Sequence, residues 1–214
     1  APYASEYEVM KAYNSAFKKL FKVKDFGIFV NKKPVDFYFT FKEKLKHCRF
    51  DGVAGALQKV VEEALVKWVR NCIKKTKINS VVIAGGVAQN IKSAIPISEI
   101  KELKNFYINP SSGDSTLSVG GCYYISSLNK NIKLKKLDNI YLGPSYSNKH
   151  VSRAISNFLI KNKNFSTSKI KNNKNIVNYI SRGKVLGRFK GRMELGQRAL
   201  GNRSILADPR KPEI

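Results

Sequence analysis

Two short apolar stretches, each followed by a glycine-bearing turn and helix-forming residues, constrain the fold of this chain most. The first is SVVIAGGVAQN at 80–90, where Val81–Ile83 precede Gly85 and Gly86. The second, at 105–125, has a strand, a PSSGD turn and a helix rich in small residues. Repeated strand–turn–helix units are typical of parallel sheets whose turns meet at one edge. The sequence therefore predicts an α/β fold with one cleft formed by the two turns.

Such turns bind nucleotides, because helix amides and absent side chains admit a phosphate or a sugar. Gly85 and Gly86 are therefore candidate ligand contacts, although many Gly-Gly turns serve packing alone. Asp114 stands where the second predicted helix begins. It can cap that helix, or it can be a hard ligand for a metal or a metal–nucleotide complex.

A second feature is the arginine-rich stretch GRFKGRMELGQRALGNRSILADPR at 187–210. Of the nine arginines in the chain, six lie from Arg182 onward, whereas lysine is spread over the whole length. The planar guanidinium matches phosphate and carboxylate groups in a bidentate manner. Apolar residues alternate with the charges, which a solvated basic loop would not need. We therefore expect an inward-folded anion site here, with a basic surface loop as the alternative.

The remaining segments give further predictions of secondary structure. The first half is predicted to contain an amphipathic helix within 1–20, two short strands within 25–40 around a turn at 32–34, and a helix at 51–75 capped by Asp51. The second half is predicted to contain a linker at 129–139, a helix at 148–161, a short helix at 176–181 ended by Gly183, and strands at 184–189 and 204–207.

Composition narrows the classes of function. The 214 residues are 43% hydrophobic and carry a net charge of +25, which invites a nucleic-acid interpretation. The excess is nearly all scattered lysine, with the Asn and Ile bias of AT-rich coding, so we do not expect nucleic acid as the main partner. No apolar run is long enough for a membrane span. Three cysteines without CxxC spacing favour a reducing cytoplasm. The first residue is not Met, and we expect a fragment.

Four motifs together resemble one family. They are AGGVAQN at 84–90, PSSGDSTLSVGG at 110–121, LGPSYS at 142–147 and GRMELGQRALGNRSILADPR at 191–210. In this order they resemble the carbamoyltransferases of the NodU/CmcH type. The resemblance covers nearly the whole chain and is weak in 4–45 and 160–182.

The resemblance implies a fold and an activity. Residues 1–135 would be the last part of an actin/hexokinase-like ATPase domain, and residues 136–214 the start of a YrdC-like domain. The family forms carbamoyl-adenylate from carbamoyl phosphate and ATP and transfers the carbamoyl group to a hydroxyl of a small-molecule or sugar acceptor. This stretch alone is expected to be inactive.

The resemblance also assigns roles to residues. The adenosine part of the nucleotide would be held by Gly85, Gly86 and Asn90. The carbamoyl-phosphate and ATP site would be formed by Arg192, Arg198, Arg203 and Ser204. Asp114 would bind Fe(II) or another divalent metal, whose remaining ligands lie in a repeated-His motif outside this chain, since neither His47 nor His150 fits.

Two departures and two alternatives accompany this reading. Gln197 stands where the family usually has Pro, and Gln89 where it usually has Leu. The alternatives are a basic nucleic-acid-binding module and a relative that acts in tRNA threonylcarbamoylation, against which the motif at 191–210 argues. We further expect a cytoplasmic protein with a small-molecule hydroxyl acceptor and no membrane partner, and leave a homodimer open.

Overall fold

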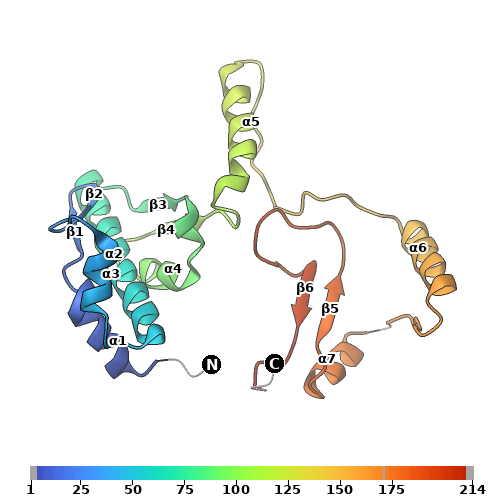
Figure 1. Ribbon diagram of the computed structural model, residues 1–214. Coiled ribbons are helices and arrows are strands. Elements are labelled where there is room, and N and C mark those ends of the chain that lie inside the picture. Colours follow the sequence, from blue (N-terminus) through green and yellow to red (C-terminus); the bar gives the residue numbers. More distant parts are fainter. Residues whose placement is uncertain (1–3, 171, 211–214) are drawn as a thin grey trace. The chain divides into compact units, whose positions relative to one another are not determined.

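The structure is a computed structural model that describes residues 4–170 and 172–210. The chain divides into two compact units, residues 1–114 and 115–214, and each is described by itself. Helices and small sheets occur in both units, so the predicted mixed α/β class is confirmed (Figure 1). Among the helices of the described residues, none combines the length and the apolar character that crossing a bilayer demands.

The first unit holds most of the regular structure. Its elements are α1 (Glu6–Ala12), a π-helical segment (Tyr13–Phe17), β1 (Phe21–Lys24), β2 (Gly27–Val30), α2 (Phe37–Lys44), α3 (Phe50–Thr76), β3 (Ser80–Ile83), a 3-10 turn (Gly86–Gln89), α4 (Ile91–Ser98) and β4 (Asn105–Ile108).

The long helix α3 is the axis on which this unit packs. Its residues contribute to two clusters of buried side chains, one near its start and one near its end. The first is Ala12, Tyr13, Phe17, Ala56 and Val60, and the second is Val69, Ile73, Ile97 and Ile100. α1 and α3 approach closely at Gly52, where an added Cβ would lie 2.8 Å from the backbone oxygen of Glu8. A side chain at this position would separate the two helices.

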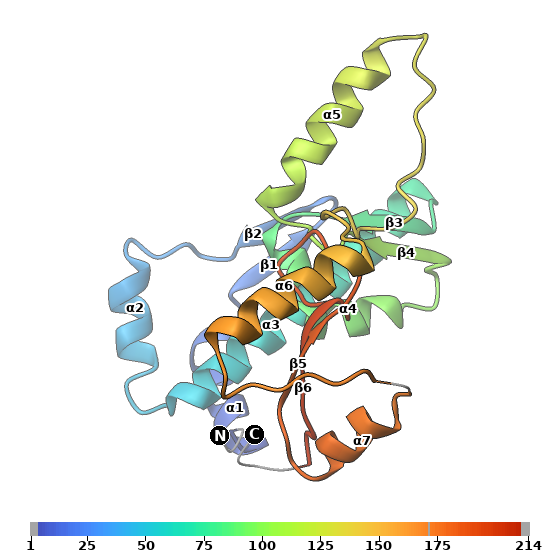
Figure 2. The same cartoon turned by 90° about the vertical axis from the view of Figure 1, so that its right-hand side faces the viewer.

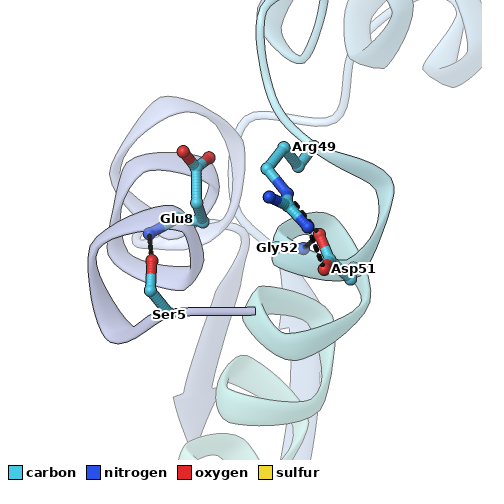
Figure 3. A network of polar contacts seen from close by, with 5 residues as sticks. All are labelled: Ser5, Glu8, Arg49, Asp51 and Gly52. Carbon is cyan, nitrogen blue, oxygen red and sulfur yellow. Dashed lines mark hydrogen bonds and ion pairs between the residues drawn. The ribbon is translucent and has the colours of Figure 1, made fainter. Parts of the chain in front are cut away.

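The start of α3 differs from the sequence prediction. Asp51 is not the N-cap; the cap is Arg49, and Asp51 lies in the first turn. Its carboxylate accepts the Gly52 N–H at 2.9 Å and both the Nε and the terminal nitrogen of Arg49, at 3.1 and 2.8 Å (Figure 3). The hydrogen bond from Arg49 is the main cause that lowers the pKa of Asp51. A negative charge in the first turn also interacts favourably with the helix dipole. Asp51 therefore stabilises the start of α3 without being its N-cap.

The prediction for residues 25–40 is wrong in its second strand, which is a helix, and in the place of the turn. The hairpin turns at Asp25, with φ of 52°, and pairs Phe21 with Val30. The aromatic run that follows is the helix α2, capped by Asp36, whose carboxylate accepts the Phe39 N–H at 3.0 Å. The alternating letters resemble a strand, but an N-cap and aromatic residues four positions apart decide for a helix.

The two predicted strand–turn–helix units are confirmed by a parallel pair of strands. β3 and β4 pair from Ser80 with Asn105 to Ile83 with Ile108. Alternate side chains, including Val81 and Phe106, pack toward α3 and α4. Because the strands are parallel, the turns that follow them lie at the same edge of the sheet.

The second unit contains α5 (Leu117–Leu128), α6 (Asn148–Lys161), α7 (Lys174–Ser181), β5 (Leu186–Phe189) and β6 (Arg203–Leu206). The predicted helix at 148–161 is confirmed, with Ser147 as its cap. Gly183 ends α7 with φ of 78°, as predicted. β5 and β6 form an antiparallel pair from Leu186 with Leu206 to Phe189 with Arg203. Among the described residues of this unit the buried ones are Glu194 and Asp208, so a polar loop forms its interior.

Candidate functional site

The turns after β3 and β4 are joined by one backbone hydrogen bond. The N–H of Gly85 donates to the carbonyl oxygen of Ser112 at 2.8 Å. Gly85 has φ of 102°, a conformation that side chains with a Cβ rarely adopt. An added Cβ at Gly85 or at Gly86 would meet no atom within 4 Å. The two glycines therefore present open backbone on which a ligand can lie closely.

Asn90 lies at the end of the same turn, but its side chain faces the body of the unit. It caps α4 and exchanges hydrogen bonds with Gln58 of α3, at 2.8 Å from its amide nitrogen and 3.2 Å to its oxygen. A small cavity of about 80 Å³ lies behind the turn, lined by Asn90, Ala84 and apolar side chains. Ligand pockets are roughly 300–1,000 Å³, so a nucleotide would have to lie on the open side of the glycines.

Asp114 lies at the start of a short 3-10 turn, Asp114–Thr116, and is exposed. The helix cap at α5 is Thr116, so the capping alternative for Asp114 is wrong. Throughout residues 4–170 and 172–210, no three His, Cys, Asp or Glu side chains gather in a group that could hold a metal ion. One carboxylate is not a sufficient donor set for Fe(II).

Ser112 is a residue beside the candidate site that the sequence reasoning did not single out. Its side chain is 4% exposed, and its hydroxyl oxygen is buried without a hydrogen-bond partner among the described residues. Such an oxygen is uncommon in folded proteins. The residue lies on the turn that accepts the Gly85 N–H and stands two positions before Asp114, next to the candidate ligand surface.

In the second unit, Arg192 is exposed, but two hydrogen bonds tie its guanidinium to the chain. Its Nε donates to the carbonyl of Gly143 at 2.6 Å, and a terminal nitrogen donates to that of Leu142 at 3.4 Å. The backbones also pair, since the Gly143 N–H donates to Met193 and the Leu195 N–H donates to Ile140. Arg192 therefore fastens the LGPSYS motif to the arginine-rich stretch.

Arg203 is held by three carbonyl oxygens of its own loop. Its terminal nitrogens donate to Lys190 at 3.0 Å, to Asn202 at 2.9 Å and to Gly191 at 3.1 Å. The guanidinium carbon lies 3.4 Å from the centre of the Phe189 ring, a cation–π contact. The neighbouring Ser204 hydroxyl accepts the Gly201 N–H at 3.0 Å.

Arg198 is different, because its side chain is exposed and makes no hydrogen bond or ion pair with any described residue. The three predicted arginines are thus brought onto one loop, but only this guanidinium keeps all of its donors available. Arg192 and Arg203, two of the predicted anion-binding residues, therefore support the loop that carries the third, Arg198.

The residue that organises this loop is Glu194, which the sequence reasoning did not single out. Its side chain is buried, and one carboxylate oxygen accepts the N–H groups of Leu200 at 2.8 Å, Asn202 at 2.9 Å and Arg203 at 3.2 Å. The hydrogen bond from its own backbone N–H is the largest cause that lowers the pKa of Glu194, and the three bonds above add to it. Together they bring this pKa to about 2. Only two acidic residues, Glu194 and Asp208, stand among the five arginines of the stretch, and this was the available signal.

Asp208 ends the loop in a similar way. Its carboxylate is buried and accepts the Nε of Arg210 at 2.9 Å and a terminal nitrogen at 2.7 Å. This bidentate pair raises the pKa of Arg210. The fifth arginine of the stretch is therefore also engaged within the chain.

Comparison with known proteins gives two family matches along the chain. A family model described as the carbamoyltransferase N-terminus matches residues 5–123, and one described as the carbamoyltransferase C-terminus matches residues 177–214. The first covers both glycine-bearing turns, and the second covers the arginine-rich loop.

Three individual relatives are similar to this chain over different lengths. The chain is 31% identical to the uncharacterized protein MJ1058 of Methanocaldococcus jannaschii over 206 residues, which is 95% of this chain and 33% of that protein. It is 29% identical to the nodulation protein NolO of Bradyrhizobium diazoefficiens over 168 residues, 75% of this chain and 29% of that protein. A shorter likeness, 37% over 67 residues, links 31% of the chain to 20% of a tRNA N6-adenosine threonylcarbamoyltransferase of Borrelia garinii.

The chain spans about a third of the length of the first of these relatives. The two family models nevertheless match its two glycine-bearing turns and its arginine-rich loop, in chain order, and the first of them alone covers more than half of the residues. On these grounds the chain belongs to the carbamoyltransferase family.

Proposed function

We propose that this chain is part of an O-carbamoyltransferase that forms carbamoyl-adenylate from carbamoyl phosphate and ATP. Water releases phosphate from carbamoyl phosphate, and the resulting carbamate attacks the α-phosphorus of ATP, so that pyrophosphate leaves. The acceptor hydroxyl, on a small molecule or a sugar, then attacks the carbamoyl carbon, and AMP leaves. The observation that carries the proposal is the match of two carbamoyltransferase models in chain order. The likeness to the nodulation protein NolO supports it.

In this proposal residues 1–135 complete an actin/hexokinase-like ATPase domain, and residues 136–214 begin a YrdC-like domain. The open backbone of Gly85 and Gly86 holds the adenosine part of ATP, which is consistent with the free space at both positions. Asn90 contributes by fixing the turn against Gln58. Asp114 supplies one ligand of a divalent metal, and the other ligands come from outside this chain.

In the arginine-rich loop, Arg198 binds the phosphate of carbamoyl phosphate. Its free guanidinium supports this role, because Arg192 and Arg203 each donate from two of their nitrogens to backbone carbonyls. Those two residues and Ser204 fix the loop so that Arg198 is presented in one place. Preorganised donors of this kind stabilise charge that develops on transferring oxygens, and losing one costs on the order of 10²–10³ in rate.

A role in tRNA threonylcarbamoylation is the second candidate. The shorter likeness to a tRNA N6-adenosine threonylcarbamoyltransferase favours it. That likeness covers 31% of the chain, whereas the C-terminal carbamoyltransferase model matches 177–214, which holds the whole arginine-rich loop. We therefore place carbamoyl transfer to a hydroxyl first.

The test is binding of carbamoyl phosphate to the purified 214-residue chain, measured by isothermal titration calorimetry. Arg198→Ala should weaken binding roughly 10- to 100-fold, the worth of one or two charge-assisted hydrogen bonds. Arg153→Ala, an exposed arginine on α6, removes the same charge away from the loop and should leave binding unchanged. Absence of binding to the unaltered chain, or equal weakening by both variants, would contradict the proposed site.

A further inference from the structure

A second pocket in the first unit lies apart from both candidate sites. It has a volume of about 540 Å³ and is enclosed by the π-helical segment, the end of the β1–β2 hairpin and α2. Neither glycine-bearing turn contributes a residue to its lining. The segment that forms it, residues 14–44, lies where the motifs named above are absent. The candidate site described above does not use this pocket, although the segment lies within the 5–123 range of the N-terminal family model.

The lining of this pocket is unusually rich in positive charge. Four of its thirteen residues are lysines, Lys18, Lys19, Lys32 and Lys44, against 31 lysines in the 214-residue chain. No Asp or Glu is among the lining residues. The uncharged part of the lining includes Asn14, Asn31 and two hydroxyl residues, so hydrogen-bonding groups accompany the charges.

None of the four ammonium groups is neutralised within the described part of the chain. They make no hydrogen bond, ion pair or ring contact there. Other lysines of the same unit do find partners, since Lys59 pairs with Glu63 at 3.6 Å and Lys75 pairs with Asp25. Like charges around one hollow repel one another, and an anion bound between them removes that cost.

Local backbone features hold the charged side chains at the rim of the pocket. Tyr13–Phe17 is a π-helical segment, a rare form that occurs frequently at functional sites, and Lys18 closes it with a hydrogen bond from its N–H to the Tyr13 carbonyl at 2.8 Å. Lys32 has a left-handed backbone, with φ of 52°, two residues after the end of β2. Lys44 is on α2, which follows the hairpin along the chain (Figure 2).

An aromatic wall faces the same space. Phe37 and Phe41 of α2 stack with ring centroids 5.8 Å apart, and Phe41 also contacts the core residue Phe17 at 5.6 Å. The volume falls within the roughly 300–1,000 Å³ of small-molecule pockets. We propose that this pocket binds a small organic phosphate with at least two negative charges and a ring, of the nucleoside-phosphate or sugar-phosphate class. The lysines hold the phosphates as point charges, and the rings cover the apolar face of the ligand.

The test uses the 214-residue chain with ADP, inorganic pyrophosphate and adenosine as probes. Backbone amide shifts in NMR locate binding, and calorimetry gives affinity. ADP and pyrophosphate should shift the amides of Phe37 and Phe41, ADP should bind more tightly than pyrophosphate, and adenosine should bind least. The double variant Lys32→Gln/Lys44→Gln should weaken ADP binding by more than tenfold at this site.

The matched control is Lys22→Gln/Lys67→Gln, which removes two exposed lysines of the same unit that do not line the pocket. It should leave binding unchanged. Equal weakening by both double variants would mean general polyanion attraction and overturn the proposal. Shifts confined to Gly85 and Gly86 would also overturn it, while leaving the proposed carbamoyltransferase site intact. Tight binding of adenosine alone would overturn the charge argument.

Discussion

Glu194 and Asn202 are joined by a hydrogen bond of 2.9 Å from the Asn202 N–H to a carboxylate oxygen, which closes a loop between residues eight positions apart. The same oxygen accepts two further N–H groups of the loop. Hydrogen bonds from backbone N–H groups to a charged carboxylate are stronger than those to a neutral acceptor. The presentation of Arg198, which lies inside this loop, therefore depends on an acidic residue that itself is buried.

Replacing Glu194 by Ala should open the arginine-rich loop while leaving the first unit folded. The amides of Leu200, Asn202 and Arg203 lose their acceptor and should exchange with solvent on the order of tenfold faster. Hydrogen exchange followed by NMR measures this. Asp138→Ala removes an exposed acidic residue of the same unit and should change none of the three rates.

Low pH should loosen the same loop without any substitution. The pKa of Glu194 is lowered to about 2 by backbone N–H groups, so its contribution to stability is present above the ordinary Glu pKa of about 4.3. That contribution is lost as the pH falls from there through about 2. The exchange rates of the Leu200 and Asn202 amides, corrected for intrinsic pH dependence, should rise in this window. Constant rates from pH 5 to pH 2 would contradict the lowered pKa.

The two adjacent glycines of the first turn should differ in their tolerance of alanine. Both have space for a Cβ, but Gly85 alone of the pair has positive φ. Gly85→Ala should therefore cost about 1–2 kcal/mol in the free energy of unfolding. Gly86→Ala, which meets no such strain, should be neutral or slightly stabilising. Urea unfolding of the two variants makes the comparison, and equal effects would show that the turn relaxes.

Tyr13 should stabilise the first unit through its hydroxyl. The phenol donates to the Glu63 carboxylate, and this bond is the first cause that raises the pKa of Tyr13 to about 12. Its contribution is present below the ordinary Tyr pKa of about 10 and is lost as the pH rises from there through about 12. Tyr13→Phe should cost about 1 kcal/mol in urea unfolding at neutral pH.

The control for this variant is Tyr107→Phe on β4, whose side chain is exposed. It removes a hydroxyl that is already solvated and should leave the unfolding midpoint unchanged. If both variants unfolded at the same midpoint as the unaltered chain, the Tyr13–Glu63 hydrogen bond would make no net contribution to stability.

The sequence predicted elements well where one local signal was strong. The helix at 148–161 has Ser147 before it and apolar residues at helical spacing, and it forms with those bounds. The parallel strands followed from short apolar runs before glycine-bearing turns, β-branched in β3 and mainly aromatic in β4. The second strand predicted within 25–40 is wrong because alternating aromatic residues fit a strand and an amphipathic helix alike. The Asp36 cap, with Phe37 and Phe41 four positions apart, decides for the helix.

The candidate site was predictable in location but not in the division of roles. Residue type shows that an arginine can bind an anion, but it does not show which oxygens lie within its reach. Arg192, Arg198 and Arg203 carry equal weight in the sequence, and only the geometry separates the free guanidinium from the two that bind carbonyls. Ser112 and Glu194 were missed for the same reason, since their roles depend on burial and on the backbone amides around them.

The Arg203 guanidinium lies among three carbonyl oxygens and the Phe189 ring. This arrangement affects how the sequence of such a basic protein can evolve. A lysine at this position keeps the formal charge but has one nitrogen in place of the planar fork, so it can satisfy only part of this arrangement. Drift from arginine to lysine, which AT-rich coding favours elsewhere in the chain, should therefore be selected against here even if no ligand ever touches the residue.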